Sequence, residues 1–133
     1  MIINITNKTT VRSVQRKISV AYPFLKIEFL RHSHQKDKAG KEHWYDHDLK
    51  LLDIAKNNQP GWIIMHHWYT ASYIKEVFEH RFGLYVQFFR RMNEDWIEIT
   101  GTDVFTIEEQ NQIGRKSVEK VHAPAWRERE LLL

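Results

Sequence analysis

Residues 1–24 read MIINITNKTTVRSVQRKISVAYPF, and residues 61–84 read GWIIMHHWYTASYIKEVFEHRFGL. When the two stretches are laid over each other without a gap, they keep one pattern of apolar and capping positions. The matched pairs are Ile2/Trp62, Ile3/Ile63, Ile5/Met65, Thr10/Thr70, Val14/Ile74, Ile18/Phe78, Tyr22/Phe82 and Phe24/Leu84. Only two of these pairs are identities, so the signal is the shared periodicity, which a fold preserves when identities drift. The sequence therefore predicts an internal duplication, which is informative about architecture and much less so about chemistry.

The first stretch has the pattern of a strand followed by a helix. Residues 2–6 alternate apolar and polar side chains, and Thr10 occupies an N-cap position. The apolar residues that follow recur at helical spacing until Pro23, which cannot continue a helix. Residues 25–31 then predict a second strand and residues 43–46 its partner, with a lysine-rich hairpin loop between them.

The second stretch repeats this order after the turn signal Pro60-Gly61. Residues 62–67 predict a strand, Thr70 caps a helix, and Gly83 replaces Pro23 as the stop signal. Two strands follow, and Thr106-Ile107-Glu108-Glu109 is a capping box that opens a C-terminal helix.

Together these segments predict an α+β protein. Its expected architecture is a tandem of duplicated strand-helix-strand-strand units that form an antiparallel sheet, with helices packed on one face and a C-terminal helix added. We expect one domain over residues 1–133, with repeats at about 1–58 and 61–121 and a tail at 122–133. The same order of elements also permits a ferredoxin-like sheet.

The predicted topology resembles the duplicated strand-helix-strand-strand module of GyrI-like effector-binding domains. That resemblance implies a single sheet with a ligand groove between the helices, and it covers about residues 1–100 as topology. The run Thr102-Asp103-Val104-Phe105-Thr106-Ile107-Glu108-Glu109-Gln110-Asn111 is similar to an uncharacterised family of small bacterial proteins, which implies no known activity.

The amino-acid composition says more about the cellular compartment of the protein than about its function. The 133 residues include no cysteine, which excludes disulfides, thiol catalysis and thiolate metal sites and fits a reducing compartment. We expect a cytoplasmic protein without signal peptide or membrane span, because no stretch approaches the roughly 20 apolar residues that a transmembrane helix needs. The net charge of +3 is well below the usual excess of a nucleic-acid-binding domain.

Tyr85 and Phe89 are the first candidate site residues. They point to the opposite side of their strand from Val86 and Phe88, so both faces of this strand carry large apolar groups. One helical layer cannot cover both faces. The C-terminal helix, a second subunit in a homodimer, or a ligand is therefore expected to bury Tyr85 and Phe89.

A second group of aromatic residues surrounds the predicted turn into the second helix. We expect Trp62 and Trp96 to lie in the core, whereas Trp68 and Tyr69 are harder to bury and are better candidates for a pocket or an interface. The predicted ligand-binding set is His67, Trp68, Tyr69, Tyr85, Phe89 and Arg90, with His67 or Arg90 as polar anchors.

These residues favour a non-catalytic binding module for a small molecule or a partner protein. No phosphate loop or ordered catalytic constellation is present, so catalytic residues, a bound metal and cofactors are not predicted. The alternative is single-stranded nucleic-acid binding, in which a basic track beside aromatic rings contacts the strand. Its basic residues come from two predicted hairpins: Arg31, Lys36, Lys38, Lys41, Arg90 and Arg91.

Overall fold

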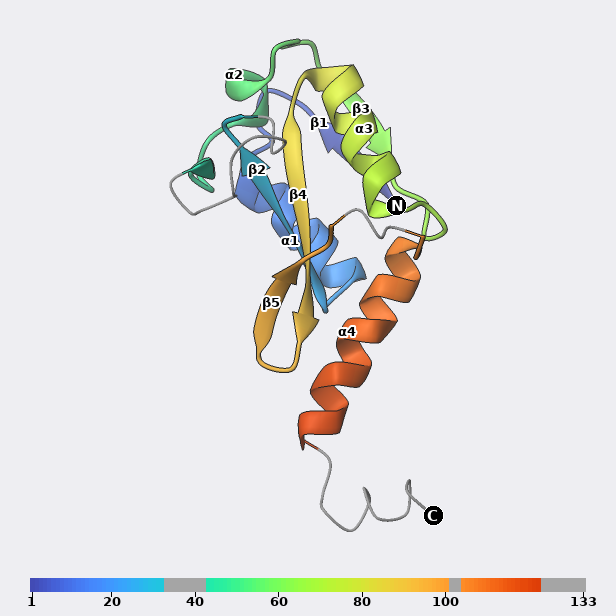
Figure 1. The fold of residues 1–133 in the computed structure, drawn as a ribbon. Coiled ribbons are helices and arrows are strands. Elements are labelled where there is room, and N and C mark those ends of the chain that lie inside the picture. Colours follow the sequence, from blue (N-terminus) through green and yellow to red (C-terminus); the bar gives the residue numbers. More distant parts are fainter. Residues whose placement is uncertain (33–42, 101–103, 123–133) are drawn as a thin grey trace, which may run out of the picture.

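The structure is a computed structural model and describes residues 1–32, 43–100 and 104–122, with side chains up to Glu119. The predicted lysine-rich hairpin loop and nearly all of the predicted tail lie outside the described residues. Within the described part, the elements in chain order are β1 (Ile2–Ile5), α1 (Val11–Ala21), β2 (Leu25–Leu30), α2 (Leu51–Ile54), β3 (Gly61–Ile64), α3 (Ala71–Phe82), β4 (Tyr85–Met92), β5 (Asp95–Glu98) and α4 (Ile107–His122). This order confirms the α+β class and the C-terminal helix (Figure 1).

The strands form two antiparallel sheets, where one sheet was expected. β1 pairs with β3 in a two-stranded sheet, here named the ribbon, and the other sheet has the order β2-β4-β5. The predicted strand at 43–46 contributes a single bridge, from Trp44 to Leu30. Each ribbon strand is short and buries one face only.

Strand partners come from opposite halves of the chain, and the register is centred on matched residues. Ile3 pairs with Ile63, its counterpart in the sequence comparison. Glu28 pairs with Gln87, which is its counterpart when one residue is deleted from the first half. The two halves thus meet at corresponding positions in both sheets, although the duplication itself stays a prediction.

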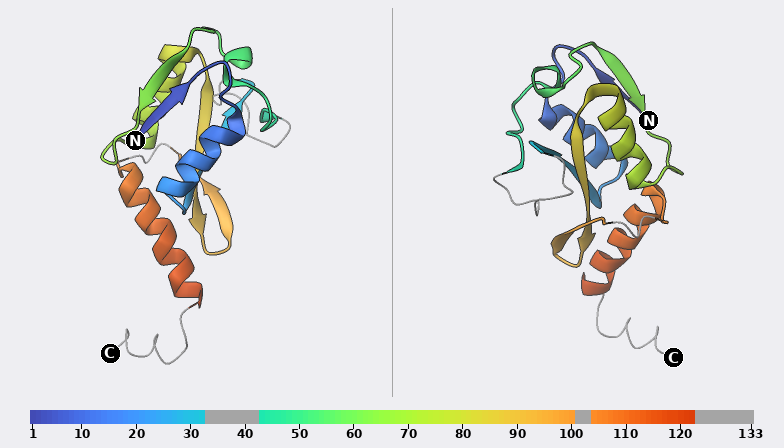
Figure 2. Two further views of the ribbon diagram at one scale, coloured as in Figure 1. Left: turned by 180° about the vertical axis from the view of Figure 1, so that it is seen from behind. Right: turned by 45° about the horizontal axis from the view of Figure 1, so that its top comes forward.

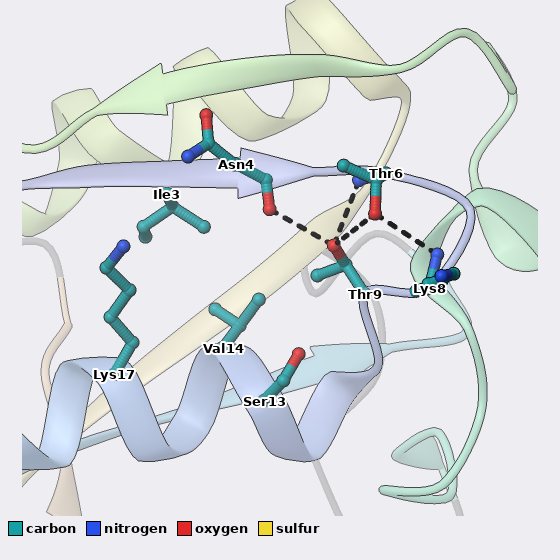
Figure 3. A pocket seen from close by; sticks show the side chains of 8 residues that line it. All are labelled: Ile3, Asn4, Thr6, Lys8, Thr9, Ser13, Val14 and Lys17. Atoms are coloured by element: carbon teal, nitrogen blue, oxygen red, sulfur yellow. Dashed lines mark hydrogen bonds between the residues drawn. The ribbon is translucent and has the colours of Figure 1, made fainter.

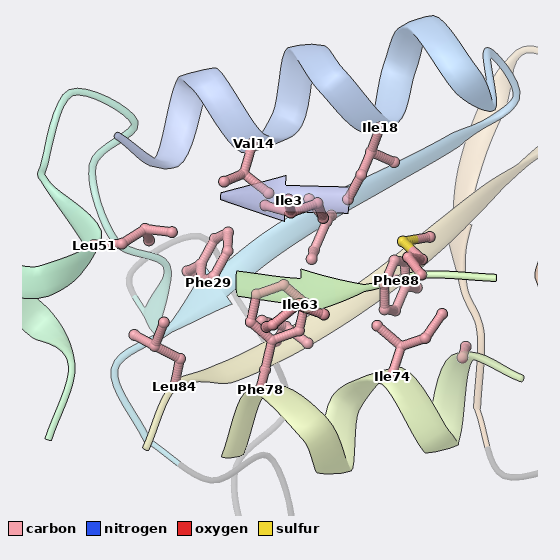
Figure 4. Packing of buried hydrophobic residues seen from close by; sticks show 14 of the residues in the cluster. Ile3, Val14, Ile18, Phe29, Leu51, Ile63, Ile74, Phe78, Leu84 and Phe88 are labelled. Carbon is pink, nitrogen blue, oxygen red and sulfur yellow. The ribbon is translucent and has the colours of Figure 1, made fainter. Parts of the chain in front are cut away.

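The core lies between the ribbon, the two helices α1 and α3, and the inner face of the larger sheet. Seen from behind, α1 and the ribbon lie on the same side of that sheet (Figure 2). Val14 from α1 and Ile74 from α3 point toward each other with Ile3 and Ile63 between them (Figure 4). All four side chains are buried, as the matched apolar periodicity predicts.

The helix ends follow from local sequence signals. Thr10 caps α1 and Thr70 caps α3, each accepting a hydrogen bond from the backbone three residues on, as predicted. The predicted capping box at α4 is also confirmed, because Thr106 and Glu109 bond each other's backbone N–H groups at 2.9 and 3.1 Å. Gly83 ends α3 at a positive φ of 63°, the left-handed conformation that glycine adopts without strain.

Helix α4 packs against the end of β4 and the chain that enters β2. The guanidinium of Arg90 donates to Gln110 on α4, and the side-chain oxygen of Asn111 accepts from the backbone N–H of Phe24. A Cβ at Gly114 would lie 2.9 Å from the Cβ of Phe24, so glycine permits the close approach of α4 at this point. The rest of α4 runs away from the core toward the C-terminal end of the chain (Figure 1).

Candidate functional site

The turn between β3 and α3 gathers five ring side chains, here named the aromatic corner: His66, His67, Trp68, Tyr69 and Tyr73. The indole of Trp68 stacks on the imidazole of His66, with centroids 4.1 Å apart and planes 11° from parallel. His67 and Tyr69 each contact the same indole in T-shaped geometry, at 5.0 and 6.1 Å. Tyr73, one turn into α3, packs on Tyr69 at 4.6 Å. The rings therefore hold one another in fixed orientations.

The start of α4 fixes the backbone of the corner. The N–H of Ile107 donates to the carbonyl of Tyr69, and the N–H of Glu108 donates to the carbonyl of His67. The Glu108 carboxylate also lies 2.8 Å from Nδ1 of His67, and both side chains are more than half exposed. Because α4 and the corner share these bonds, His67, Trp68 and Tyr69 are presented by a rigid turn.

Several side chains of this region face solvent. The exposed fraction of Trp68 is 56%, and Tyr73 and Phe105 are also exposed. Beside the corner, an open depression of about 340 Å³ lies along α4 and includes Phe105, Glu108 and Ile113 in its lining. Large aromatic groups, the His67–Glu108 pair and a depression of mixed polar and apolar lining thus lie together at the start of α4.

The predicted binding set does not come together in one place. His67, Trp68 and Tyr69 are in the aromatic corner, whereas Tyr85 and Phe89 lie on β4, on the face of the larger sheet that turns away from the core. Arg90 is directed to α4, where it bonds Gln110. The six predicted residues therefore belong to three separate environments.

Phe89 is covered by the segment that follows the hairpin loop. The ring centroids of Phe89 and Trp44 lie 5.6 Å apart in a T-shaped contact. The ammonium of Lys26 lies within 5.1–5.4 Å of the rings of Phe89, Trp44 and Trp96. Trp44 and Lys26 thus supply the cover for Phe89 that was expected from α4, a second subunit or a ligand.

Tyr85 has a cation partner of its own. Lys56 Nζ donates to the Tyr85 hydroxyl at 3.0 Å and lies 5.2 Å from the ring centroid. This hydrogen bond, with the charge interaction between the same two groups, raises the pKa of Lys56 above its ordinary value. Tyr85 is therefore engaged within the chain and does not form part of an open groove with Trp68.

A buried polar cluster was not recognised from the sequence. The Glu28 carboxylate is almost fully buried, and its Oε1 accepts from the Gln15 amide at 3.1 Å and lies 2.9 Å from His47 Nε2. Both amide hydrogens of Gln15 are used, by Ile27 O and by Glu28, so His47 is the donor to the carboxylate. The sequence signal that could have indicated this cluster is Glu28, a single acid inside the apolar run LKIEFL. These bonds hold His47 against β2, which is a structural role.

Gln87 lies beside Glu28 in the sheet and is fully buried. Its amide nitrogen donates to Ile99 O at 3.2 Å, while its Oε1 has no hydrogen-bond partner in the described part of the chain.

Across residues 1–32, 43–100 and 104–119, no three His, Asp or Glu side chains converge as a metal site would require. No helix among the described residues is long and apolar enough to cross a membrane.

Comparison with known proteins adds no further guide, because no family model, curated protein or solved structure matches the chain.

Proposed function

We propose that this protein is a non-catalytic binding module that docks a partner protein on the aromatic corner. One observation carries the proposal: Trp68 is 56% exposed, yet its indole is held by ring contacts on several sides. Tryptophan and tyrosine dominate the energetic centres of protein interfaces. An indole that is already oriented loses little conformational entropy on binding, so its contact area converts efficiently into affinity.

The shape of the region supports a protein partner over a small molecule. A small-molecule site encloses most of its ligand, whereas the depression beside the corner is an open hollow along one helix. Its rim carries the His67–Glu108 pair, which suits the polar margin of a protein interface. The small-molecule alternative and the nucleic-acid alternative both stay predictions, and Lys36, Lys38 and Lys41 of the latter lie outside the described residues.

A matched pair of tryptophans tests the proposal. Trp62, which was expected in the core, is 55% exposed and has no ring partner among the described residues, so it matches Trp68 in chemistry and exposure. Proteins captured from an extract of the source organism by the wild type, Trp68→Ala and Trp62→Ala would be quantified by mass spectrometry. We expect a captured protein that Trp68→Ala loses and Trp62→Ala retains, with affinity reduced by about thirtyfold or more, as for an interface hot spot.

Two results would contradict the proposal. One is a set of captured proteins that Trp68→Ala retains as well as the wild type does. The other is the absence of any protein enriched by the wild type over Trp68→Ala, at extract concentrations that cover micromolar affinities. Circular dichroism and thermal unfolding of both variants would show that each keeps the fold, as expected for exposed side chains.

We also infer that the two halves are copies of one ancestral unit. Support comes from the sheet registers, which are centred on Ile3/Ile63 and Glu28/Gln87, and from the matching caps Thr10 and Thr70. The GyrI-like topology, a bacterial origin, a cytoplasmic location and a homodimer stay predictions. Sequences of homologues in which the halves are more alike would test the duplication.

A further inference from the structure

The outer edge of β1 presents unpaired backbone groups. Met1 and Met65 exchange both backbone hydrogen bonds, at 3.2 and 2.8 Å, so bonded pairs fall on Met1, Ile3 and Ile5. The N–H and C=O groups of Ile2 and Asn4 therefore point away from β3. Thr9 bonds the carbonyl of Asn4, whereas the N–H and C=O of Ile2 and the N–H of Asn4 have no partner among the described residues.

A groove runs along this edge, between β1 and α1. One hollow of about 300 Å³ is lined by Ile3 and Asn4 from β1 and by Ser13, Val14 and Lys17 from α1, among others (Figure 3). A second, of about 480 Å³, continues it past Met1 and shares Lys17. The groove is thus open beside the backbone groups that lack partners.

The lining of the groove combines apolar, uncharged polar and basic side chains. Val20 lines the second hollow and is 83% exposed, and Lys8, Arg16 and Lys17 bring three cations to the two hollows. None of the residues that line either hollow is acidic. Lys17 extends from α1 toward Ile3 and Asn4 (Figure 3), so its charge lies beside the free edge.

The corresponding edge of β3 differs at one matched carbonyl. There, Arg81 on α3 donates to the carbonyl of Trp62 at 2.8 Å. In the matched halves, Trp62 corresponds to Ile2 and Arg81 corresponds to Ala21, which lines the second hollow. Alanine cannot reach the carbonyl of Ile2, so the edge of β1 lacks the cap that β3 has.

We propose that an extended acidic segment of a partner protein adds to β1 as an antiparallel or parallel strand and lies in the groove between β1 and α1. The free groups of Ile2 and Asn4 would supply main-chain hydrogen bonds, as in other complexes formed by strand addition. Lys8, Arg16 and Lys17 favour a segment with carboxylates. A second copy of β1 is disfavoured as the occupant, because it would bring these cations against their own copies. This surface is separate from the aromatic corner, so each proposal can fail without the other.

The probe is a library of random nine-residue peptides displayed on phage. We expect selection on the wild-type protein to enrich sequences that alternate β-branched residues with Asp or Glu. Binding of a selected synthetic peptide would then be measured by fluorescence anisotropy. Ala21→Arg should weaken it by about tenfold or more, because an arginine at this position can cap the Ile2 carbonyl and fill the groove.

Ser19→Arg is the matched control, since Ser19 is exposed on α1 but lines neither hollow. Both variants add the same positive charge, so nonspecific attraction of an acidic peptide would strengthen binding to both. Loss with Ala21→Arg alone, together with slower hydrogen exchange of the Ile2 and Asn4 amides in the complex, would support strand addition.

Three outcomes would overturn the proposal. The first is a selection in which the wild-type protein enriches no peptides beyond those enriched by Ala21→Arg. The second is equal peptide binding by Ala21→Arg and the wild type. The third is unchanged hydrogen exchange of the Ile2 and Asn4 amides in the complex. Thermal unfolding of Ala21→Arg would establish that the variant is folded. Were it unfolded, Lys17→Glu would replace it and should abolish the preference for acidic peptides.

Discussion

β1 and β3 are neighbours in one ribbon, yet their outer edges differ. Both bury the same matched side chains, Ile3 and Ile63 among them, and both expose the alternate ones. β3 is capped by Arg81, whereas β1 faces an open basic groove beside Ala21. The comparison teaches that the two halves agree in the apolar framework and differ in the polar groups at its margin.

The shared framework can be broken most strongly in the core. Phe78 and Ile18 are matched and fully buried, but Phe78 also makes a T-shaped contact with Phe29 at 5.6 Å. We expect Phe78→Ala to lower the free energy of unfolding by about 3–5 kcal/mol, and Ile18→Ala to lower it by a smaller amount. Urea denaturation measures both. An equal or reversed order would show that the larger ring of Phe78 and its contact with Phe29 do not make it the more stabilising of the two matched residues.

The ends of the two helices give the next largest difference. α3 ends at Gly83 with positive φ, whereas α1 ends at Tyr22 with a φ of −134°. A Cβ at Gly83 would lie 2.6 Å from the Cβ of Lys56. Gly83→Ala should therefore cost about 2 kcal/mol, from the left-handed conformation and the clash together.

Lys56→Gly separates these two contributions. Introduced with Gly83→Ala, it removes the contacting Cβ and should make the cost of Gly83→Ala smaller than in the wild-type background, leaving the conformational part. A double-mutant cycle by urea denaturation measures the difference. A full cost in both backgrounds would show that contact with Lys56 contributes nothing.

The N-caps should differ only slightly. Thr10→Ala and Thr70→Ala each remove one side-chain acceptor and should cost about 1 kcal/mol. In α1, Ser13 also accepts from the Thr10 N–H at 3.0 Å, and the residue that matches it in α3 is Tyr73. Ser13→Ala should therefore add a smaller loss in the first half alone. Equal stability of Ser13→Ala and the wild type, by thermal unfolding, would refute a role for this second bond.

Alkaline pH should give the smallest difference between the halves. Partial burial, and secondarily the charge of Glu108, raise the pKa of Tyr22 above its ordinary 10.0, and the matched residue Phe82 has no proton to lose. A raised pKa means that the folded state binds the proton more tightly than the unfolded state. The resulting stability is complete below pH 10.0 and is lost as the pH rises through the folded-state pKa. The free energy of unfolding of Tyr22→Phe should fall less over this pH range than that of the wild type. Identical pH profiles of stability for the two proteins would exclude the effect.

Local features of this fold were predictable from the sequence because their causes are local. Thr10, Thr70 and Thr106 each bond backbone within three residues, so a few letters determine where the helices begin. The separation of the strands into two sheets was not predictable, because every ribbon bond joins segments from opposite halves of the chain. Periodicity identifies a buried face without identifying the partner strand.

The candidate site was predictable only in part. Trp68 is exposed, as expected from its position between a strand and a helix cap, whereas Tyr69 is partly buried against the core. Burial of Phe89 was predictable, but the residue that covers it was not, because no local pattern indicates that Trp44 packs on its ring. The burial of Glu28 depends on Gln15 and His47, and three separate segments meet there only after folding.

The pairing of opposite halves has a consequence for the order in which the chain folds. Each half supplies only one of the two ribbon strands, β1 or β3. The strand β2 likewise pairs with β4 from the second half. During synthesis, the first half must therefore wait for β3 and β4 before its apolar surface is covered. Two fragments cut at the turn before Gly61 should each be largely unfolded alone and should fold when mixed.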